Sequence, residues 1–331
     1  MRRIAIDELC NIIKNVGDKK VALTFHTIGD RDGVGSAVAL SEYFKNATVV
    51  TPDFITNNAR RMLSYLSLGD KVTGKFPPDA EVIVVLDANN LPALGKLRET
   101  LESSSAEIIF IDHHAPHREM EMEATMFNDE SFNSTASIIT DVFKRIGARL
   151  TRNMAMLLLN GITADSADLQ NSSPQTFRQI AELLEVAKTD YSFFTDYFHE
   201  GIPVNNKYQV VKDVFAAKCE VVGNYIIIYG RATEHANINA DTALRLNVDA
   251  AVFWVTSNAE ASISARLRSP LDKKLSMHLG LMMEDIGKIV GGNGGGHACA
   301  AGAYGPRKEA AQQAGEEIVR RIKEKMLAPG A

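Results

Sequence analysis

Three apolar runs in the first third of the chain each lead into side chains that can bind a metal ion. With their polar ends, the runs span residues 21–26, 82–87 and 108–114, and the loop after the first run adds Asp30 and Asp32. We interpret each run as a buried parallel strand, because short, continuous apolar segments are typical of strands covered on both faces. In open α/β sheets, ligands bind in the crevice outside the carboxyl ends of the strands. The sequence therefore predicts a functional site at that edge of an N-terminal sheet.

The spacing of the runs predicts an α/β domain with a doubly wound parallel sheet. Strand-like runs alternate with helical patterns up to about residue 165, including a helix over residues 34–46 and a short strand over residues 48–50. Strand, helix and strand at this spacing form βαβ units and a parallel sheet. Residues 174–217 then have a helical pattern, broken once at residues 201–203, and they contain a candidate connector.

The pattern changes near residue 220, where a smaller α+β domain is predicted. Strands are expected over residues 221–229, 250–255 and 261–266, with a hairpin turn at residues 257–258. A helix, a glycine-rich loop and a terminal helix are expected over residues 275–290, 291–296 and 308–326. We therefore divide the chain into an N-terminal domain, a helical connector and a C-terminal domain, over residues 1–185, 186–218 and 219–331.

Charge and cysteine content exclude some classes of protein. The 331 residues include 36 Lys and Arg against 41 Asp and Glu, so the chain lacks the general basic field that would hold a long polyanion. The three cysteines form no CxxC pair, which argues against a disulfide framework or a thiolate zinc site. No segment approaches the roughly 18 apolar residues of a membrane span. We expect a soluble cytoplasmic protein, without a membrane partner, whose nucleic-acid partner would be short or locally bound.

The loop after the first run contains the first candidate metal ligands. It reads His26-x-x-x-Asp30-x-Asp32-Gly33-x-Gly35-Ser36. One imidazole and two carboxylates, without a thiolate, suit hard or borderline divalent ions such as Mn²⁺ or Mg²⁺. The structural alternative is a polar loop in which Asp32 caps the next helix.

Part of this segment also imitates a dinucleotide-binding fingerprint. Gly33 and Gly35 follow a strand, and Asp53 stands about twenty residues further on. However, Val38 occupies the place of the third glycine, and the two carboxylates of the loop would repel a bare pyrophosphate. We therefore reject a dinucleotide site, whereas a bound metal would remove the repulsion.

The ends of the other runs, and a later segment, complete the candidate metal site. The six candidate ligands are His26, Asp30, Asp32, Asp87, His113 and Asp165. Four carboxylates would give the bare site a formal charge of about −4, where like charges raise one another's pKa. Two divalent cations would cancel this charge, and ions ~3.5–4 Å apart can activate a water and stabilise both oxygens of a phosphoryl displacement. We infer metal-assisted hydrolysis of a phosphoester.

In this order, the motifs resemble the four motifs of the DHH phosphoesterase superfamily. They are the His26–Ser36 segment, the lone strand-end Asp87, Asp112-His113-His114, and Gly161-Ile-x-x-Asp165-Ser166. Further on, Gly294-Gly-Gly-His297-Ala-Cys-Ala-Ala-Gly302 resembles the GGGH-x-x-AAG segment of the DHH-associated domain. The resemblance covers nearly the whole chain. Two positions depart from the family pattern without removing a ligand: Gly29, where Pro is usual, and Ser166, where Thr is more frequent.

The resemblance implies a role for each residue of the metal site. One ion would be held by His26, Asp30 and Asp87, and the other by Asp32, His113 and Asp165, with Asp87 bridging the two. His114 would face the scissile phosphate as an electrostatic stabiliser or proton donor. Asp112 would orient the two histidines.

The glycine run is the candidate substrate-binding segment of the second domain. It lacks a following Lys-Ser or Lys-Thr and so is no P-loop. It could be a flexible linker, but within a domain its backbone N–H groups could form an anion-binding nest, which we favour. The resemblance implies that Gly294, Gly295, Gly296 and His297 bind a far phosphate or terminal nucleotide. Arg266 would assist, with Arg268 as the competing candidate.

Several functions fit these observations. The first is a phosphodiesterase that uses a metal-activated water to hydrolyse short RNA or DNA, or linear dinucleotides, to mononucleotides, similar to NrnA-type oligoribonucleases. The second is a RecJ-like exonuclease on longer single strands, although no basic channel is visible. The third is an exopolyphosphatase or inorganic pyrophosphatase, but the basic Ser-Arg-Lys-type motif of the pyrophosphatases is missing. The fourth is a non-catalytic nucleic-acid-binding scaffold, which the full ligand set disfavours.

A homodimer is compatible with each of these functions.

Overall fold

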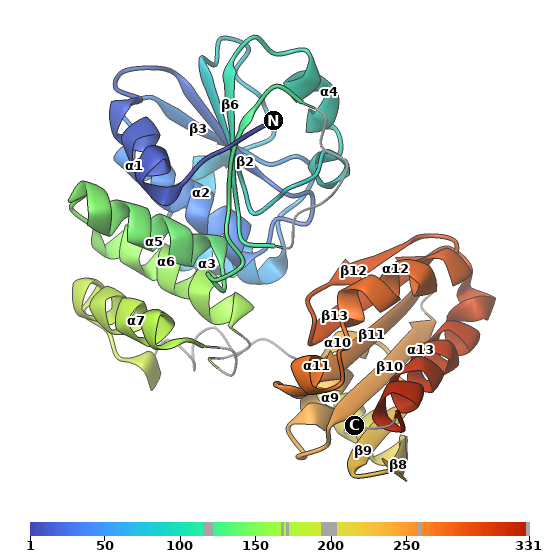
Figure 1. Cartoon of the computed structure of the whole chain (residues 1–331). Helices are drawn as coiled ribbons and strands as arrows, with labels where there is room; N and C mark the ends of the chain where they lie inside the picture. The colour runs from blue at the N-terminus through green and yellow to red at the C-terminus, as the bar shows by residue number, and fades with distance from the viewer. Residues whose placement is uncertain (115–121, 167–168, 170–171, 193–203, 257–259, 329–331) are drawn as a thin grey trace. The chain divides into compact units, whose positions relative to one another are not determined.

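A seven-stranded parallel sheet organises residues 1–200, the first of the two units of the computed structural model (Figure 1). The structure describes residues 1–114, 122–166, 169, 172–192, 204–256 and 260–328. Neighbouring strands are all parallel, in the order β1 (Arg2–Arg3), β7 (Thr125–Asn128), β6 (Glu107–Asp112), β5 (Val82–Leu86), β2 (Val21–Phe25), β3 (Ala47–Val50) and β4 (Val72–Thr73). The predicted α/β class and parallel sheet are confirmed.

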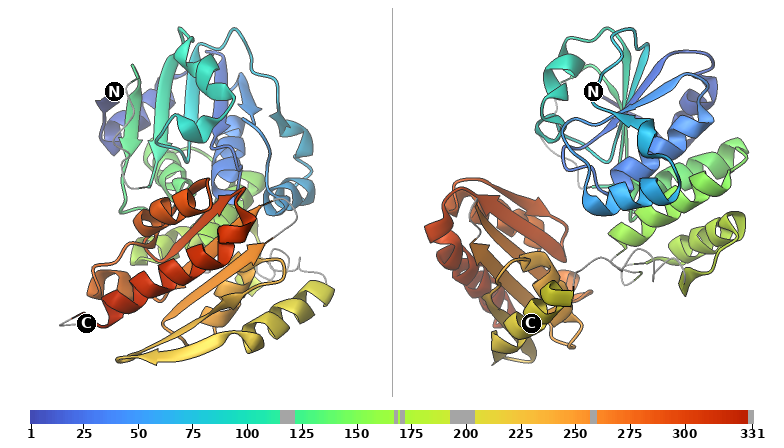
Figure 2. Two further views of the ribbon diagram at one scale, coloured as in Figure 1. Left: turned by 90° about the vertical axis from the view of Figure 1, so that its right-hand side faces the viewer. Right: turned by 180° about the vertical axis from the view of Figure 1, so that it is seen from behind.

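Helices cover both faces of this sheet (Figure 2). The larger layer contains α1 (Ile6–Asn15), α2 (Arg31–Tyr43), α3 (Asn57–Tyr65), α5 (Thr135–Ile146), α6 (Arg152–Asp165) and α7 (Pro174–Ala187). The short helix α4 (Leu97–Glu102) packs on the opposite face. Every residue of β2 and β5 is buried, which explains why these strands are continuous apolar runs in the sequence.

Helix α2 begins earlier than predicted because Asp30 caps it. Its first residue is Arg31, and Asp30 Oδ1 accepts hydrogen bonds from the backbone N–H groups of Asp32 and Gly33 at 3.0 and 3.1 Å. The expected start at residue 34 is therefore wrong, and so is the alternative in which Asp32 is the cap. The apolar pattern marks only the part of the helix that packs on the core, whereas capping sets its first residue.

Close packing of α2 against α6 depends on a glycine. A Cβ atom built on Gly35 would lie 2.8 Å from the backbone oxygen of Leu157 in α6. Any side chain here would push the two helices apart. Because α2 and α6 both carry candidate metal ligands, this contact also fixes the distance between those ligands.

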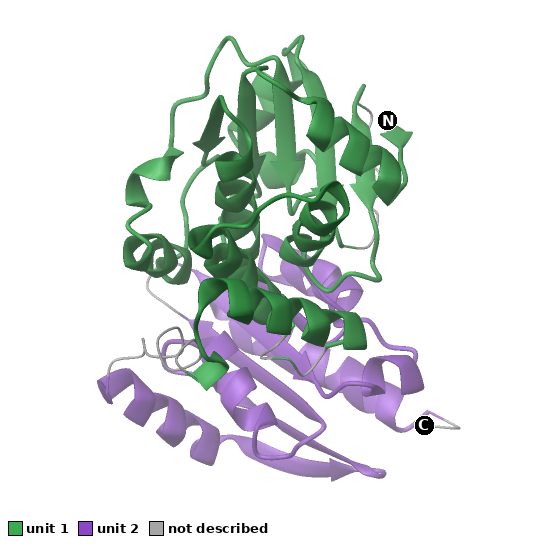
Figure 3. Cartoon of the chain, turned by 90° about the vertical axis from the view of Figure 1, so that its left-hand side faces the viewer, with its two compact units in different colours: residues 1–200 green, residues 201–331 purple. Residues whose placement is uncertain are grey.

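The second unit, residues 201–331, contains a mixed six-stranded sheet (Figure 3). The strand order is β12 (Asn293–Gly296), β13 (Ala300–Gly305), β11 (Ala261–Leu267), β10 (Ala250–Thr256), β9 (Tyr225–Arg231) and β8 (Lys218–Val222). Only the pairing of β9 with β10 is parallel. Helices α9 (Val204–Ala216) and α10 (Ala236–Leu244) pack on one face, and α11 (Leu271–Lys274), α12 (Leu279–Ile289) and α13 (Ala311–Met326) on the other. The predicted smaller α+β domain is confirmed as a separate layered unit.

Four element predictions in this unit need correction. The single strand expected over residues 221–229 is the hairpin of β8 and β9, which turns at Gly223 with a φ of +60°. The helix expected over residues 275–290 begins at Leu279, and the terminal helix is preceded by a 3₁₀ turn over Lys308–Ala310. The glycine-rich loop is mostly strand β12. Sequence patterns miss these features because turns and edge strands depend on partners elsewhere in the chain.

The division between the units falls after residue 200, within the predicted connector over residues 186–218. Helix α9, in this connector, packs against α10 and β9 of the second unit. The predicted break at residues 201–203 and the predicted turn at residues 257–258 lie outside the described residues.

We predict that Gly35→Ala destabilises the first unit. The added methyl group would meet a backbone oxygen that cannot rotate away, so we expect a loss of about 1–3 kcal/mol in the free energy of unfolding. Chemical denaturation monitored by circular dichroism measures this loss. Gly69→Ala is the matched control, because a Cβ atom at Gly69 has no neighbour within 4 Å. Equal stability of the two variants would contradict the packing argument.

Candidate metal centre

The loop after β2 brings His26 and Asp30 to the carboxyl edge of the sheet, and the first turn of α2 adds Asp32. Its backbone turns at Gly29, which has a φ of +47° and whose carbonyl accepts the N–H of Thr56 at 2.9 Å. Proline has a φ near −65° and cannot adopt this conformation. Glycine fits this conformation, whereas the Pro of the related motif would not.

Asp87 lies at the centre of the site. It follows β5 in the left-handed conformation, with a φ of +58°, which Asp tolerates better than most residues. Its Oδ2 lies 3.3 Å from Nε2 of His26, and its Oδ1 lies 3.6 Å from Nε2 of His113. The two oxygens of one buried carboxylate thus face two different imidazoles.

His113 follows β6 and contacts a carboxylate from a different helix. Its Nε2 lies 3.1 Å from Oδ2 of Asp165, the last residue of α6, and 3.9 Å from Oδ2 of Asp32. Asp32 lies in the first turn of α2 and is completely buried. Parallel strands and the packing of α2 on α6 therefore bring these three side chains together.

His114 is fixed by Asp112, the last residue of β6. The Nδ1 atom of His114 lies 2.8 Å from Oδ1 of Asp112. The side chain of Asn128, at the end of β7, donates to the carbonyl of His114 at 2.8 Å and to that of Asp112 at 3.2 Å. Because Asp112 engages Nδ1, the Nε2 atom is the one that can contact a substrate. Sequence reasoning missed Asn128, although it is the polar residue that ends the next strand of the sheet.

The first turn of α5 also contacts the site, and sequence reasoning missed it. The N–H groups of Thr135 and Ala136 donate to Oδ2 and Oδ1 of Asp32 at 2.7 and 2.8 Å. The available signal was the segment Ser134 to Ser137, which is typical of a helix start. A Cβ atom on Gly161 of α6 would lie 2.6 Å from Oδ1 of Asp32, so only glycine fits there.

The carboxylates raise the pKa values of the histidines. Burial lowers the pKa of His26, but hydrogen bonds with Asp30 and Asp87 outweigh it and raise the pKa well above the ordinary value of 6.5. Burial also lowers the pKa of His113, but hydrogen bonds with Asp165 and Asp87 outweigh it. The pKa of His113 therefore also lies well above 6.5. In the metal-free protein, protonated imidazoles thus balance part of the negative charge.

The pKa values of two buried carboxylates, Asp32 and Asp87, are shifted in opposite directions. Burial and the neighbouring charges of Asp87 and Asp165 raise the pKa of Asp32 well above 3.8. Burial also opposes ionisation of Asp87, but hydrogen bonds from His113 and His26 hold its pKa well below 3.8. A divalent cation would favour the ionised form of every carboxylate in the cluster.

The six predicted ligands come together as two overlapping sets that share Asp87. In each set, one nitrogen or oxygen from every residue lies within 4.8 Å of the others; the sets are His26, Asp30 and Asp87, and Asp32, Asp87, His113 and Asp165. A further set joins Asp87 with Asp112, His113 and His114. Carboxylate oxygens and imidazole nitrogens without thiolates fit Mn²⁺ or Mg²⁺.

In the second unit, the predicted glycine segment forms an edge strand. Gly294, Gly295 and Gly296 lie in β12 and pair with β13, so the expected nest within a loop is wrong. A Cβ atom on Gly294 would lie 1.8 Å from the oxygen of Met283 in α12, whereas one on Gly295 would have no neighbour within 4 Å. His297 follows the strand and is exposed. Packing therefore requires glycine at residue 294, but does not require it at residue 295.

The two candidate arginines have different surroundings. Arg266 forms an ion pair with Asp241 of α10 at 2.6 Å and donates to Ser264 Oγ at 3.0 Å. Arg268 donates to the backbone oxygens of Leu244, the last residue of α10, and of Val248 in the segment that follows it. This arrangement makes Arg268 a support for the backbone and leaves Arg266 as the better candidate for substrate binding.

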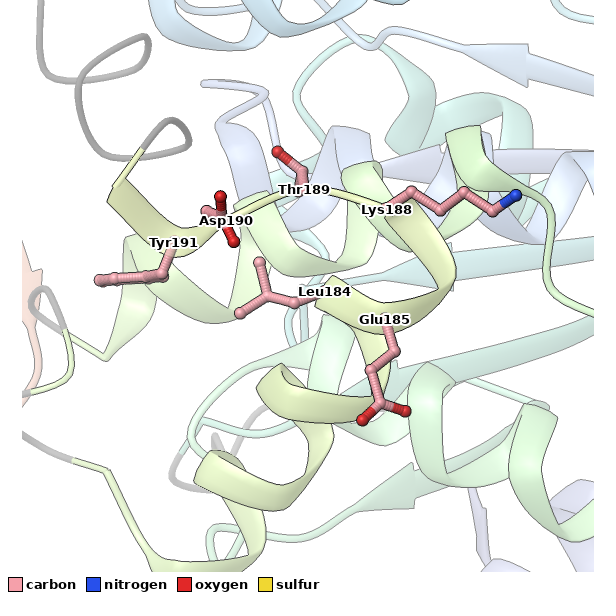
Figure 4. A pocket seen from close by; sticks show the side chains of 6 residues that line it. All are labelled: Leu184, Glu185, Lys188, Thr189, Asp190 and Tyr191. Carbon is pink, nitrogen blue, oxygen red and sulfur yellow. The ribbon is translucent and has the colours of Figure 1, made fainter.

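A depression of about 440 Å³ lies at the C-terminal end of α7, and none of the six candidate metal ligands lines it (Figure 4). Its lining residues are Leu184, Glu185, Lys188, Thr189, Asp190 and Tyr191. The charged ends of Glu185 and Lys188 extend in different directions, so the polar groups do not converge as they do in binding sites (Figure 4).

Among the described residues, no helix has the length and apolar character that crossing a membrane requires.

Comparison with known proteins identifies the family. The model of the DHH family, N-terminal domain, matches residues 20–162, and that of the DHHA1 domain matches residues 224–324. Together the two matches cover most of the chain, which belongs to the DHH family. Members of this family are metal-dependent phosphoesterases. The chain is therefore a DHH-family phosphoesterase, with a cluster of acidic residues and histidines suited to metal binding.

Similarity to individual proteins agrees with this family assignment. The chain is 26% identical over 313 residues, 92% of each chain, to the uncharacterized protein MJ0988 of Methanocaldococcus jannaschii. It is 25% identical to a probable manganese-dependent inorganic pyrophosphatase of Bacillus cereus, over 52% of this chain and 57% of the relative. An exopolyphosphatase-related protein from Bacteroides fragilis has the same fold, with a TM-score of 0.78, 18% identity, and coverage of 98% and 97% of the two chains.

We predict opposite effects of pH on the metal-free and the metal-bound protein. The raised pKa values of His26 and His113 contribute stability that is complete below about pH 6.5 and is lost as the pH rises through the folded-state values. Metal-free protein should therefore melt at a lower temperature at pH 8.5 than at pH 6.5. Mn²⁺ binds neutral imidazole, so the rise in melting temperature that it causes should increase over the same range. Differential scanning calorimetry tests both trends, and a stabilisation by Mn²⁺ that falls with pH would contradict the assignment.

Proposed function

We propose that this protein is a metal-dependent phosphodiesterase that hydrolyses short oligonucleotides or linear dinucleotides to mononucleotides. The observation that carries the proposal is the pair of ligand sets joined by Asp87 in the first unit. The first unit would act on the scissile phosphate, and the second unit would bind a nucleotide end.

The residues of the first unit would divide the catalytic work. Two divalent ions, with Mn²⁺ favoured because a relative is described as manganese-dependent, would polarise phosphoryl oxygens and lower the pKa of a water. One ion would be held by His26 and Asp30, and the other by Asp32, His113 and Asp165. Asp87 would contribute to both. His114 would present its Nε2 atom to the phosphate, stabilise negative charge there and donate a proton to the leaving oxygen. Asp112 would keep the His114 ring in this orientation.

A small-residue surface of the second unit supports binding of a nucleotide end. Gly295 pairs with Gly302, and Gly302 pairs with Ser264, so these residues lie side by side on one face of the sheet. Arg266 pairs with Ala300 on the same face, where Asp241 and Ser264 fix its guanidinium. A sugar-phosphate could approach the backbone where glycines leave room, and Arg266 could pair with its phosphate.

The alternative functions have less support. A RecJ-like activity on long single strands needs a basic channel, whereas the chain has a net charge of −5. Pyrophosphatase activity is favoured by one specific observation, the relative that matches about half of this chain. Exopolyphosphatase activity and a homodimer lack a specific contact in their favour among the described residues. A non-catalytic scaffold would not need to retain all six candidate ligands.

A comparison of substrates tests the proposal. Metal-free protein supplied with Mn²⁺ should cleave a two-nucleotide RNA with a higher kcat/KM than a 24-nucleotide single strand or inorganic pyrophosphate. Asp87→Asn should abolish turnover of each substrate, because an amide cannot replace the shared carboxylate. Preference for the long strand would indicate a RecJ-like exonuclease, and preference for pyrophosphate would refute the nucleic-acid assignment.

We predict that His297→Ala impairs the cleavage of dinucleotides but not that of a phosphodiester without a second phosphate. His297 follows the glycine strand and is exposed, so its loss should raise KM for a dinucleotide by about tenfold, the effect of roughly one lost charge-assisted hydrogen bond. Cleavage of bis-p-nitrophenyl phosphate, which has no second phosphate, should be unchanged. His235→Ala, which removes another imidazole of the same unit, is the control. An equal loss of kcat/KM on both substrates would contradict the proposed role of His297.

A further inference from the structure

The first turn of α5 contacts two carboxylates of the proposed metal centre at once. The backbone N–H groups of Thr135 and Ala136 donate to the two oxygens of Asp32. In addition, the hydroxyl of Thr135 donates to Oδ1 of Asp87 at 3.3 Å. These contacts join residues that are 48 to 104 positions apart in the sequence.

These contacts are additional to the capping of α5. Ser134 already caps the helix, since its side chain accepts the N–H of Ser137 at 3.0 Å. Thr135 and Ala136 each direct an N–H to one oxygen of Asp32, which fixes the plane of that carboxylate. The positive end of the helix dipole also favours an anion at this place. Asp32 is therefore held in one orientation by the protein itself.

The hydroxyl of Thr135 holds the carboxylate of Asp87 in one orientation as well. It contacts Oδ1, the oxygen that faces His113, while Oδ2 faces His26. Rotation of the carboxylate would break the hydrogen bond and exchange the two oxygens between the ligand sets. Thr135 is completely buried, so water cannot replace its hydroxyl.

Helix α5 is firmly attached beside the site. The side chain of Gln179, in α7, accepts a hydrogen bond from the hydroxyl of Ser137 and donates to its backbone oxygen at 2.9 Å. On the side of α6, a Cβ atom at Gly161 would lie 2.6 Å from Cβ of Ala136, so the helices are in close contact. A side chain in the first turn of α5 can therefore act as a rigid support.

We propose that Thr135 is a positioning residue that determines which oxygen of Asp87 each ligand set uses, and so fixes the spacing of the two metal-binding halves. The inference rests on the two-ion centre of the proposed function. Thr135 does not contact substrate in this proposal, and it acts through Asp87 and Asp32.

Titration of metal-free protein with Mn²⁺ tests the role of Thr135. Thr135→Val keeps the shape of the side chain and removes the hydroxyl, so we expect a loss of about 10–100-fold in affinity for at least one ion. Thr135→Ser should restore the affinity. Isothermal titration calorimetry gives the number and affinity of the ions, and electron paramagnetic resonance shows whether two Mn²⁺ ions are magnetically coupled at a fixed distance.

Thr140→Val is the matched control for a purely structural effect. Thr140 lies in the same helix and is also buried, but its hydroxyl donates to the backbone oxygen of Ala136 at 2.7 Å. Melting temperatures of the metal-free variants should fall to a similar extent for Thr135→Val and Thr140→Val. Affinity for Mn²⁺ and coupling of the ions should change only for Thr135→Val.

The possible failures can be told apart. If the wild type binds two coupled ions and Thr135→Val binds them with unchanged affinity and coupling, the positioning role is wrong and the proposed function stands. If Thr140→Val loses as much affinity as Thr135→Val, the effect is structural and the positioning role is again wrong. If the wild type binds fewer than two ions, the two-ion proposal fails, and the inference fails with it.

Discussion

The shared carboxylate of Asp87 is the contact on which the rest of the site depends. It follows the central strand β5 in a left-handed conformation, and its two oxygens face imidazoles that follow the neighbouring strands β2 and β6. This arrangement is possible only because the three strands are parallel and adjacent, so their carboxyl ends lie at one edge. Hydrogen bonds from His26 and His113 keep Asp87 ionised despite its burial. A divalent ion on each side would replace the positive charge that these protonated imidazoles supply in the metal-free protein.

Close packing of helices holds the other ligands around Asp87. Asp32 and Asp165 lie on different helices, and glycines at the contact allow α2 and α6 to approach each other. Gly35 leaves room for a backbone oxygen, and Gly161 leaves room for the carboxylate of Asp32 itself. Helix α5 completes the support with two backbone N–H groups and one hydroxyl. The geometry of the candidate site is therefore a consequence of helix packing as much as of the sheet.

Much of this arrangement could be predicted from residue patterns. The runs ending at His26, Asp87 and Asp112 are buried strands, as expected, because strands covered on both faces must be apolar throughout. The six candidate ligands were also recognisable, since five of them follow the ends of these strands and Asp165 adds a further carboxylate from a later segment. The glycine run was less predictable. Glycine is compatible with a loop and with an edge strand, and only the contacts of Gly294 with α12 and the pairing with β13 distinguish the two.

The sequence by itself determined the fold class of both units, the kind of metal donors, and the edge of the sheet where they meet. These properties follow from local patterns, namely apolar runs and the polar residues that end them. Tertiary structure alone decided that Asp30 caps α2, that Arg268 supports the backbone, and that Thr135 contacts both Asp32 and Asp87. Each of these contacts depends on the direction of a hydrogen bond, and most join groups far apart in the chain. A residue pattern carries no information about which distant group will lie within hydrogen-bonding distance once the helices have packed.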